Sequence, residues 1–312
     1  MAAQTKPLGI LTGFDGSDHA VRAIHWAAVE AYTRSVPLTV ITAFTVPRII
    51  AGENTPSVVE DSLARRSAEQ VVEKGREVLK DFPGQVDFRI EYGDAAGVLV
   101  AHSSDAEVSV VGARGRGGFI GRLLGSVSSA LPAHANSPTV IVGDSYEPPQ
   151  GEGEARYKRV DERPVVVGMD QSKGSRLAAL HAAEVAAAQE VPLRLVMAIP
   201  PLDGALLWYP ELGPREDDTE RRRRELEDQL KHHVQWLSKH FDQLTITPVV
   251  SDGLPVEVLQ VETNHSQLTV VGTRGRGGIA SALLGSTSSG VIMHASGPVM
   301  VVPAGDDPRL ED

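Results

Sequence analysis

Glycine and arginine gather in a short segment that occurs twice in the chain. The first copy, VVGARGRGGFIGRLLGSVSS, begins at Val110, and the second, VVGTRGRGGIASALLGSTSS, begins at Val270. Glycine lets the chain turn sharply and lets a ligand approach the backbone, because it has no Cβ. A glycine-serine pair before a helix adds unpaired N–H groups and the positive end of the helix dipole, which favour a phosphate. The segment therefore predicts a phosphate-binding loop in each copy.

The spacing of the glycines differs from that of two common phosphate loops. Gly112 and Gly115 directly follow an apolar run, and nine residues separate Gly115 from Gly125 and Ser126. No lysine precedes the serine, as it does in a P-loop. The dinucleotide fingerprint belongs after the first strand of a βαβ unit, and this segment comes later. A flexible loop with a glycine-rich helix entry is the alternative, and the recurrence of the same glycines argues against it.

The duplication extends over most of the chain. GFDGSDHAVRAIHWA, which contains Asp15, matches GMDQSKGSRLAALHA, which contains Asp170. In each copy, short apolar runs alternate with segments whose apolar residues recur at helical spacing. Strands that alternate with helices and are apolar on both faces predict a parallel sheet covered on both sides.

The fold expected is therefore α/β, with two repeated domains. Each domain is predicted to be an open parallel five-stranded sheet with helices on both faces, a Rossmann-like arrangement. The first domain is expected at residues 1–145 and the second at 163–305. A segment rich in proline, glycine and charge, at 146–162, reads as a linker, and 306–312 reads as a C-terminal tail.

Composition limits the classes of function. The chain has 312 residues, no cysteine and a formal net charge of −11. This charge argues against general binding to nucleic acid or to an anionic membrane. No apolar run is long enough to span a bilayer, and the N-terminus lacks the pattern of a signal peptide, so we expect a cytoplasmic protein.

The glycine spacing resembles a known signature. G-2x-G-9x-G-[ST], which fits both segments, is similar to the ATP-binding signature of universal stress proteins. The aspartate that this family carries after its first strand is matched by DGS at Asp15 and by DQS at Asp170. The replacement of Gly16 by Gln171 is the main departure from the pattern, and it bears on the second site.

The resemblance implies an adenine-nucleotide pocket in each copy, with ATP and Mg²⁺ as ligands. The aspartates are expected near the nucleoside, backbone at Ala43 and Ala198 near the adenine edge, and the glycine segments around ribose and phosphates. The residues expected to bind nucleotide are Gly13, Asp15, Ala43, Gly112, Arg114, Gly115, Arg116, Gly117, Gly118, Gly125, Ser126 and Val127 in the first copy. In the second copy they are Gly168, Asp170, Ala198, Gly272, Arg274, Gly275, Arg276, Gly277, Gly278, Gly285, Ser286 and Thr287.

The same resemblance implies a regulatory protein of the stress response, with a role in dormancy, hypoxia or growth control. We expect the two copies to associate with each other, and a homodimer and a protein partner fit the same picture. No nucleophile–base pair or zinc ligand set stands out in the sequence, so at most slow ATP hydrolysis is expected. An ATP-hydrolysing enzyme and a sensor of another adenine nucleotide, such as cAMP, are the alternatives.

Several residues allow two interpretations. Asp15 and Asp170 could bind the nucleoside or cap the helix that follows. The arginines of the glycine segments could contact phosphate, lie in solvent or pair across an interface. Trp208 and Tyr209 lie in a long loop and could cover the pocket or pack against the other copy.

Overall fold

The chain folds into two compact units, Met1–Val160 and Asp161–Asp312. In the computed structural model the described residues are 6–46, 58–116, 124–151, 153–158, 161–201, 216–275 and 284–311. Trp208, Tyr209, Gly117, Gly118, Arg276, Gly277 and Gly278 lie outside them.

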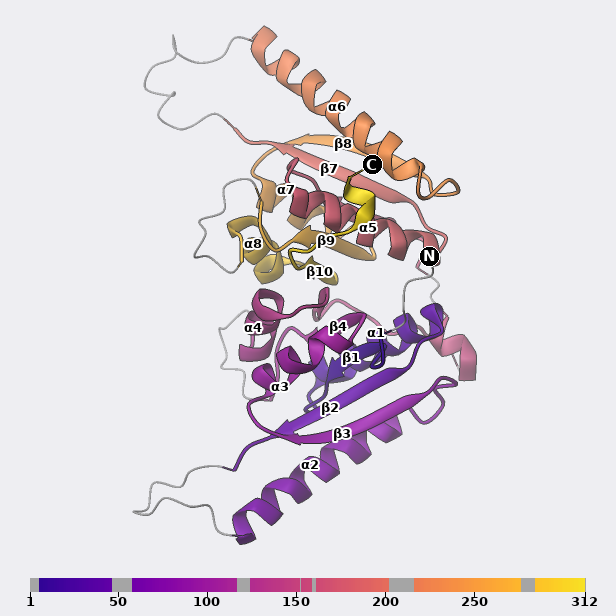
Figure 1. The fold of residues 1–312 in the computed structure, drawn as a ribbon, viewed down its shortest axis with the longest axis vertical. Helices are drawn as coiled ribbons and strands as arrows, with labels where there is room; N and C mark the ends of the chain where they lie inside the picture. The colour runs from indigo at the N-terminus through magenta and orange to yellow at the C-terminus, as the bar shows by residue number, and fades with distance from the viewer. Residues whose placement is uncertain are drawn as a thin grey trace, which may run out of the picture. The chain divides into compact units, whose positions relative to one another are not determined.

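The first unit alternates strands and helices, as the sequence predicts (Figure 1). Its strands run in the order β3-β2-β1-β4-β5 across a sheet in which the described neighbours pair in parallel. The elements are β1 (Ile10–Gly13), α1 (Asp18–Arg34), β2 (Leu38–Phe44), α2 (Val58–Val78), β3 (Val86–Tyr92), α3 (Ala95–His102), β4 (Val108–Gly112), α4 (Ser126–His134), β5 (Thr139–Val142) and the 3-10 turn η2 (Gly153–Tyr157).

The second unit repeats this architecture. Its strands run in the order β8-β7-β6-β9-β10, again with parallel pairing. The elements are β6 (Val165–Gly168), α5 (Lys173–Ala188), β7 (Leu193–Ile199), α6 (Glu216–Ser238), β8 (Ile246–Asp252), α7 (Pro255–Glu262), β9 (Leu268–Gly272), α8 (Ser286–His294), β10 (Val299–Val302) and the 3-10 turn η5 (Pro308–Leu310). The predicted α/β fold with two repeated domains is confirmed.

Helices cover both faces of each sheet. In the first unit α1 packs on β1 and β4, α2 packs on β2 and β3, and α3 packs against α4. The strands in the centre are buried on both faces because valine, leucine and isoleucine follow one another without alternation, as in Val165–Gly168. No helix among the described residues is long and apolar enough to cross a bilayer.

The turn η2 closes the first unit at the end opposite its strands' carboxyl ends. Tyr157 is fully buried, and its ring meets that of Phe82 edge-on, with centroids 4.9 Å apart. Nη2 of Arg156 lies 3.2 Å from Nε2 of buried His25 on α1. The segment after β5 is therefore packed against its own unit over this turn.

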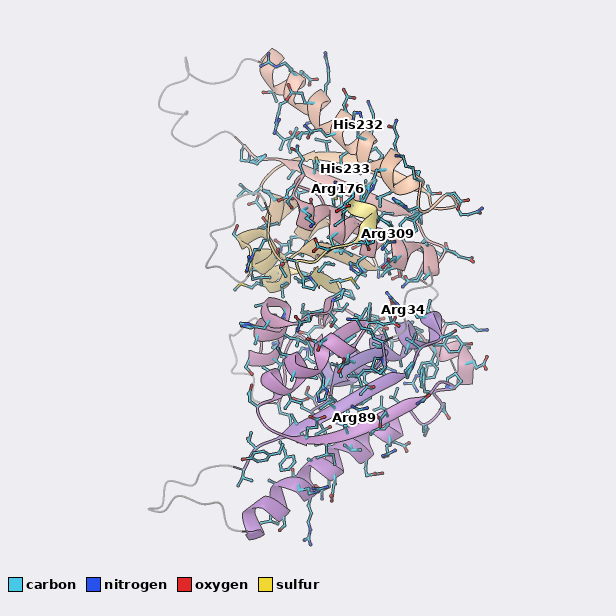
Figure 2. The ribbon with its side chains drawn as sticks, in the orientation of Figure 1. Arg34, Arg89, Arg176, His232, His233 and Arg309 are labelled. Atoms are coloured by element: carbon cyan, nitrogen blue, oxygen red, sulfur yellow. The ribbon has the colours of Figure 1, made fainter. Side chains whose placement is uncertain are left out.

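The turn η5 closes the second unit in a related way. Arg309, labelled in Figure 2, donates to Glu184 on α5 over 2.7 Å. Its backbone oxygen accepts a hydrogen bond of 2.9 Å from Nε1 of Trp236 on α6, and Leu310 is buried. We refer to η2 and η5 together as the closing turns. Each ties the first helix of its unit to the chain that follows the last strand.

Candidate functional site

A cavity of about 840 Å³ opens in the first unit at the carboxyl ends of its strands. Parallel strands end at one edge of their sheet, so Gly13, Ala43 and Gly112 meet there although they lie far apart in sequence. This volume is in the range of pockets that hold a small molecule. The cavity lies where the glycine segment leaves β4.

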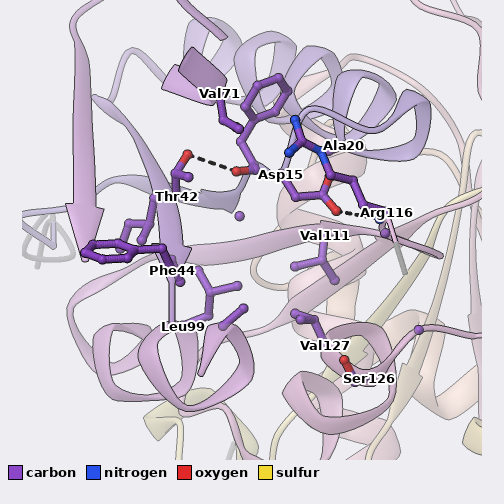
Figure 3. Close-up of a pocket in the computed structure, with 18 of the residues that line it drawn as sticks. Asp15, Ala20, Thr42, Phe44, Val71, Leu99, Val111, Arg116, Ser126 and Val127 are labelled. Atoms are coloured by element: carbon purple, nitrogen blue, oxygen red, sulfur yellow. Dashed lines mark hydrogen bonds between the residues drawn. The ribbon is translucent and has the colours of Figure 1, made fainter. Parts of the chain in front are cut away.

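The cavity is lined by apolar and polar side chains, with Phe44 and Leu99 lying across from Arg116 and Ser126 (Figure 3). The apolar side is formed mainly by aliphatic and aromatic side chains from β2, α2, α3 and β4: Ile41, Phe44, Leu63, Val71, Leu99 and Val111. The polar side is formed by Asp15, Arg114, Arg116, Ser126 and Ser128. A ligand with a flat apolar ring and a charged tail would match this division.

Asp15 joins the two loops that border the polar side. Its Oδ1 accepts a hydrogen bond of 2.9 Å from the backbone N–H of Ser17, and its Oδ2 accepts one of 2.8 Å from that of Arg116. Ser17, not Asp15, is the N-cap of α1, because its Oγ accepts from the N–H of Ala20. The aspartate therefore holds the glycine loop in place and does not cap the helix.

Two glycines at this edge are required by close packing. A Cβ on Gly115 would lie 2.7 Å from Oδ2 of Asp15, and a Cβ on Gly112 would lie 2.7 Å from the backbone of His19. Real Cβ atoms do not approach that closely, so a side chain at either position would displace the loop or helix α1.

The start of α4 faces the same cavity. Gly125 is the N-cap and Ser126 the first helical residue, so the Ser126 hydroxyl lines the cavity instead of capping the helix. Oγ of buried Ser128 donates to the carbonyl of Ala113 over 2.6 Å and accepts from the N–H of Gly125 over 2.9 Å. The first N–H groups of a helix have no partner within it, so this end of α4 offers donors to an anion.

Arg114 already has an anionic partner within the first unit. Its guanidinium hydrogen-bonds the carboxylate of Asp144, which follows β5. The same carboxylate lies 3.2 Å from Nδ1 of His19 and 3.5 Å from Nη1 of Arg22. Burial lowers the pKa of His19 below its ordinary value; Asp144 opposes that shift, while Arg114 and Arg22 add to it.

The second unit repeats the central arrangement. Gly168, Ala198 and Gly272 lie at or near the carboxyl ends of β6, β7 and β9. Oδ1 of Asp170 accepts from the N–H of Ser172 over 3.0 Å, and Ser172 caps α5. A Cβ on Gly275 would collide with the carboxylate of Asp170, as at the first loop.

One corner of the two sites differs. In the first unit Nη2 of Arg116 lies 2.7 Å from where a Cβ on Gly16 would stand, and Lys74 donates to the Gly16 carbonyl over 2.5 Å. In the second unit Gln171 has the left-handed φ of 68° in the matching turn, and its side chain bonds that of Gln229. Gln229 thus stands where the first unit has Lys74, and Gln171 stands where it has Gly16, at the cost of backbone strain.

The cavity brings together the described residues predicted for the first site. Gly13, Asp15, Ala43, Gly112, Arg114, Gly115, Arg116, Gly125, Ser126 and Val127 all line it. Sequence reasoning missed the part of the cavity wall formed by α2. It also missed Ser128, whose hydroxyl hydrogen-bonds both Ala113 and Gly125. Its counterpart Ser288, which donates to the Gly272 carbonyl over 2.6 Å, recurs at the same place in the second segment, and that recurrence is the signal that could have found both serines.

Both halves of the chain match the model of one protein family. The model of the universal stress protein family matches the chain twice, at residues 9–143 and 162–303. The chain belongs to the universal stress protein family. Each copy matches separately, so this is a tandem member, as the duplicated glycine segments predict.

Similar proteins of the same length strengthen this conclusion. "Universal stress protein Rv2623" of Mycobacterium tuberculosis is 32% identical over 315 residues, with 96% of this chain and 98% of that protein covered. "Universal stress protein Rv1996" of the same species is 31% identical over 333 residues and covers 99% of each. A universal stress protein structure from Archaeoglobus fulgidus, 18% identical, aligns with 97% of this chain and 98% of its own at a TM-score of 0.66, which shows the shared fold.

Proposed function

We propose that the chain is an ATP-binding regulatory protein, with one adenine-nucleotide site in each unit. The observation that carries this proposal is the two-sided cavity of the first unit. Its apolar side, with Phe44 and Leu99, would take the adenine ring, and the polar side would take ribose and phosphates. The family to which the chain belongs supports the same reading.

The phosphate end of the proposed site rests on donors and not on catalytic groups. The N-terminus of α4 supplies N–H groups and a positive dipole end, while Ser126 adds a hydroxyl. Mg²⁺ would accompany the triphosphate and balance part of its charge; the oxygens of the phosphates themselves would hold it. Since Asp15 is already bonded to two backbone N–H groups, it is poorly placed to activate water. We therefore propose slow hydrolysis at most.

Regulation would follow from occupancy. A nucleotide that binds one arrangement of the glycine loop more tightly than another shifts the population toward it. The hydrogen bond from the Arg116 N–H to Asp15 joins two loops that a ligand would contact. A rearrangement of the glycine loop would therefore alter this hydrogen bond. We propose that this state is read by a protein partner in the stress response, in the control of growth or in dormancy and hypoxia.

The first experiment is to denature the purified chain and identify any released nucleotide by mass spectrometry, counted per chain. About two adenine nucleotides per chain would support the proposal, and their phosphate number would separate ATP from cAMP. Titration of the emptied protein with ATP and Mg²⁺ follows, with Gly115→Asp and Gly275→Asp each expected to remove one site. No nucleotide and no binding on titration would overturn the proposal. Rapid turnover that Gly115→Asp abolishes would favour an ATP-hydrolysing enzyme instead.

A further inference from the structure

Asp144 is bound by three side chains beside the cavity: Arg114, His19 and Arg22. Its carboxylate bonds the guanidinium of Arg114 and lies within 3.5 Å of His19 and Arg22. Arg114 lines the cavity, whereas Asp144 does not. One arginine thus stands between a possible ligand in the cavity and a carboxylate of the protein.

The charge of this group is set by the two arginines and the carboxylates near them. Burial lowers the pKa of His19, so the imidazole is neutral at pH 7. Two guanidinium groups, Arg22 and Arg114, therefore share the carboxylate of Asp144. Any phosphate that uses Arg114 must compete with this contact.

The described residues of the second unit have no matching arrangement. Gly174, Leu177 and Ala304 stand where the first copy has His19, Arg22 and Asp144. Among the described residues, no carboxylate lies within 4 Å of the Arg274 guanidinium, which matches Arg114. The two aspartates that follow β10 have other partners, since Asp306 pairs with Lys173 and Asp307 pairs with Arg309.

We propose that Asp144 is an internal competitor for the phosphates of a nucleotide, and that it makes the two sites unequal. The inference rests on the proposed function and deepens it. In the first site the phosphate tail must displace Asp144 from Arg114, and in the second site Arg274 is available without such displacement. Asp144 therefore reduces the ratio of ATP affinity to AMP affinity at the first site. The second site, which has Ala304 at the matching position, is not affected in this way.

The test measures ATP and AMP affinities at one site at a time by calorimetry at low salt. In a Gly275→Asp background, Asp144→Asn should tighten ATP by about three- to fivefold, as expected for loss of one partly exposed ion pair, and AMP by less than about twofold. Glu147→Gln removes the same charge from an exposed position nearby and should change neither affinity. In a Gly115→Asp background, Ala304→Asp should weaken ATP by a similar factor.

A second variant separates competition from a general effect of charge. In the presence of Arg114→Gln, Asp144→Asn should no longer alter ATP affinity, because the contested group is gone. An unchanged or weakened ATP affinity in Asp144→Asn overturns the inference, and so does an equal gain with Arg114→Gln present. If the parent chain binds ATP at both sites, such a result leaves the proposed function standing. If the parent binds no nucleotide, both proposals fail.

Discussion

Oδ2 of Asp15 lies 2.7 Å from the point where a Cβ on Gly115 would stand. The glycine is thus required by the protein's own carboxylate, before any ligand is considered. The same relationship recurs between Asp170 and Gly275. Each pair brings the loop after the first strand against the loop after the fourth.

Gly115→Ala should weaken ATP binding at the first site by at least about tenfold, equivalent to ~1.4 kcal/mol. The added methyl group would push Asp15 away and break its bond to the Arg116 N–H. Calorimetric titration of ATP in a Gly275→Asp background measures the effect. Gly97→Ala on α3 is the matched control, because its Cβ meets nothing closer than 3.7 Å. Parent-like affinity in Gly115→Ala would show that the link is not needed.

Gly125→Ala separates a structural requirement from a requirement of the ligand. A Cβ there would make only ordinary contacts, at 3.5 Å or more, and φ is −80°, which alanine adopts freely. We expect an unchanged melting temperature together with ATP affinity reduced by about tenfold, because the methyl group would stand where phosphate approaches. A large drop in melting temperature, or unchanged affinity, would contradict this account of Gly125.

Tyr157→Ala should destabilise the first unit by about 3–4 kcal/mol, as large aromatic truncations in a core do. The ring of Tyr157 fills the space beside Phe82, and the alanine would leave it empty. Tyr157→Phe should be neutral or slightly stabilising, since the hydroxyl has no hydrogen-bond partner among the described residues. Urea denaturation compares the two, and a loss of stability in the phenylalanine variant would point to a partner for the hydroxyl.

The first unit should lose stability as the pH falls from about 6.5 to about 4. Burial, together with the charge of Arg156, lowers the pKa of His25 to about 4, below its value of 6.5 in an unfolded chain. Below pH 6.5 His25 takes up a proton in the unfolded chain before it does so in the folded one. The free energy of unfolding of the first unit therefore falls with pH, and the part that depends on neutral His25 is lost near pH 4. It amounts to about 3 kcal/mol.

His25→Leu provides the control for this pH effect, because Leu180 stands at the matching position of the second copy. The variant should show a flatter loss of stability between pH 6.5 and 4. Urea denaturation at several pH values measures it, with hydrogen exchange of α1 amides identifying the transition of the first unit. An identical pH profile in parent and variant would rule out His25 as the source.

Much of the fold could be predicted because it depends on local patterns. Valine-rich runs without alternation became central parallel strands, and the repeat of Asp15 at Asp170 located the two loops. The family identification is confirmed by the matches to both copies. Binding of nucleotide by the glycine segments remains a prediction.

The features that were missed depend on contacts between distant parts of the chain. Asp144 lies 30 residues beyond Arg114, and nothing in the spacing indicates their ion pair. The 146–162 segment reads as a linker because proline, glycine and charge dominate it, yet burial of the single side chain of Tyr157 orders its end. Composition averages over such a segment and cannot detect one anchoring residue.

The closing turns η2 and η5 differ between the two copies in their position and in their partners. The family matches stop at residues 143 and 303, before either turn begins. The connection to the turn spans 143–152 in the first copy and only 303–307 in the second, and the arginines meet different partners, His25 and Glu184. Each ending thus makes contacts that only the first helix of its own copy offers. A recombinant gene that exchanged the two endings would encode units that no longer close.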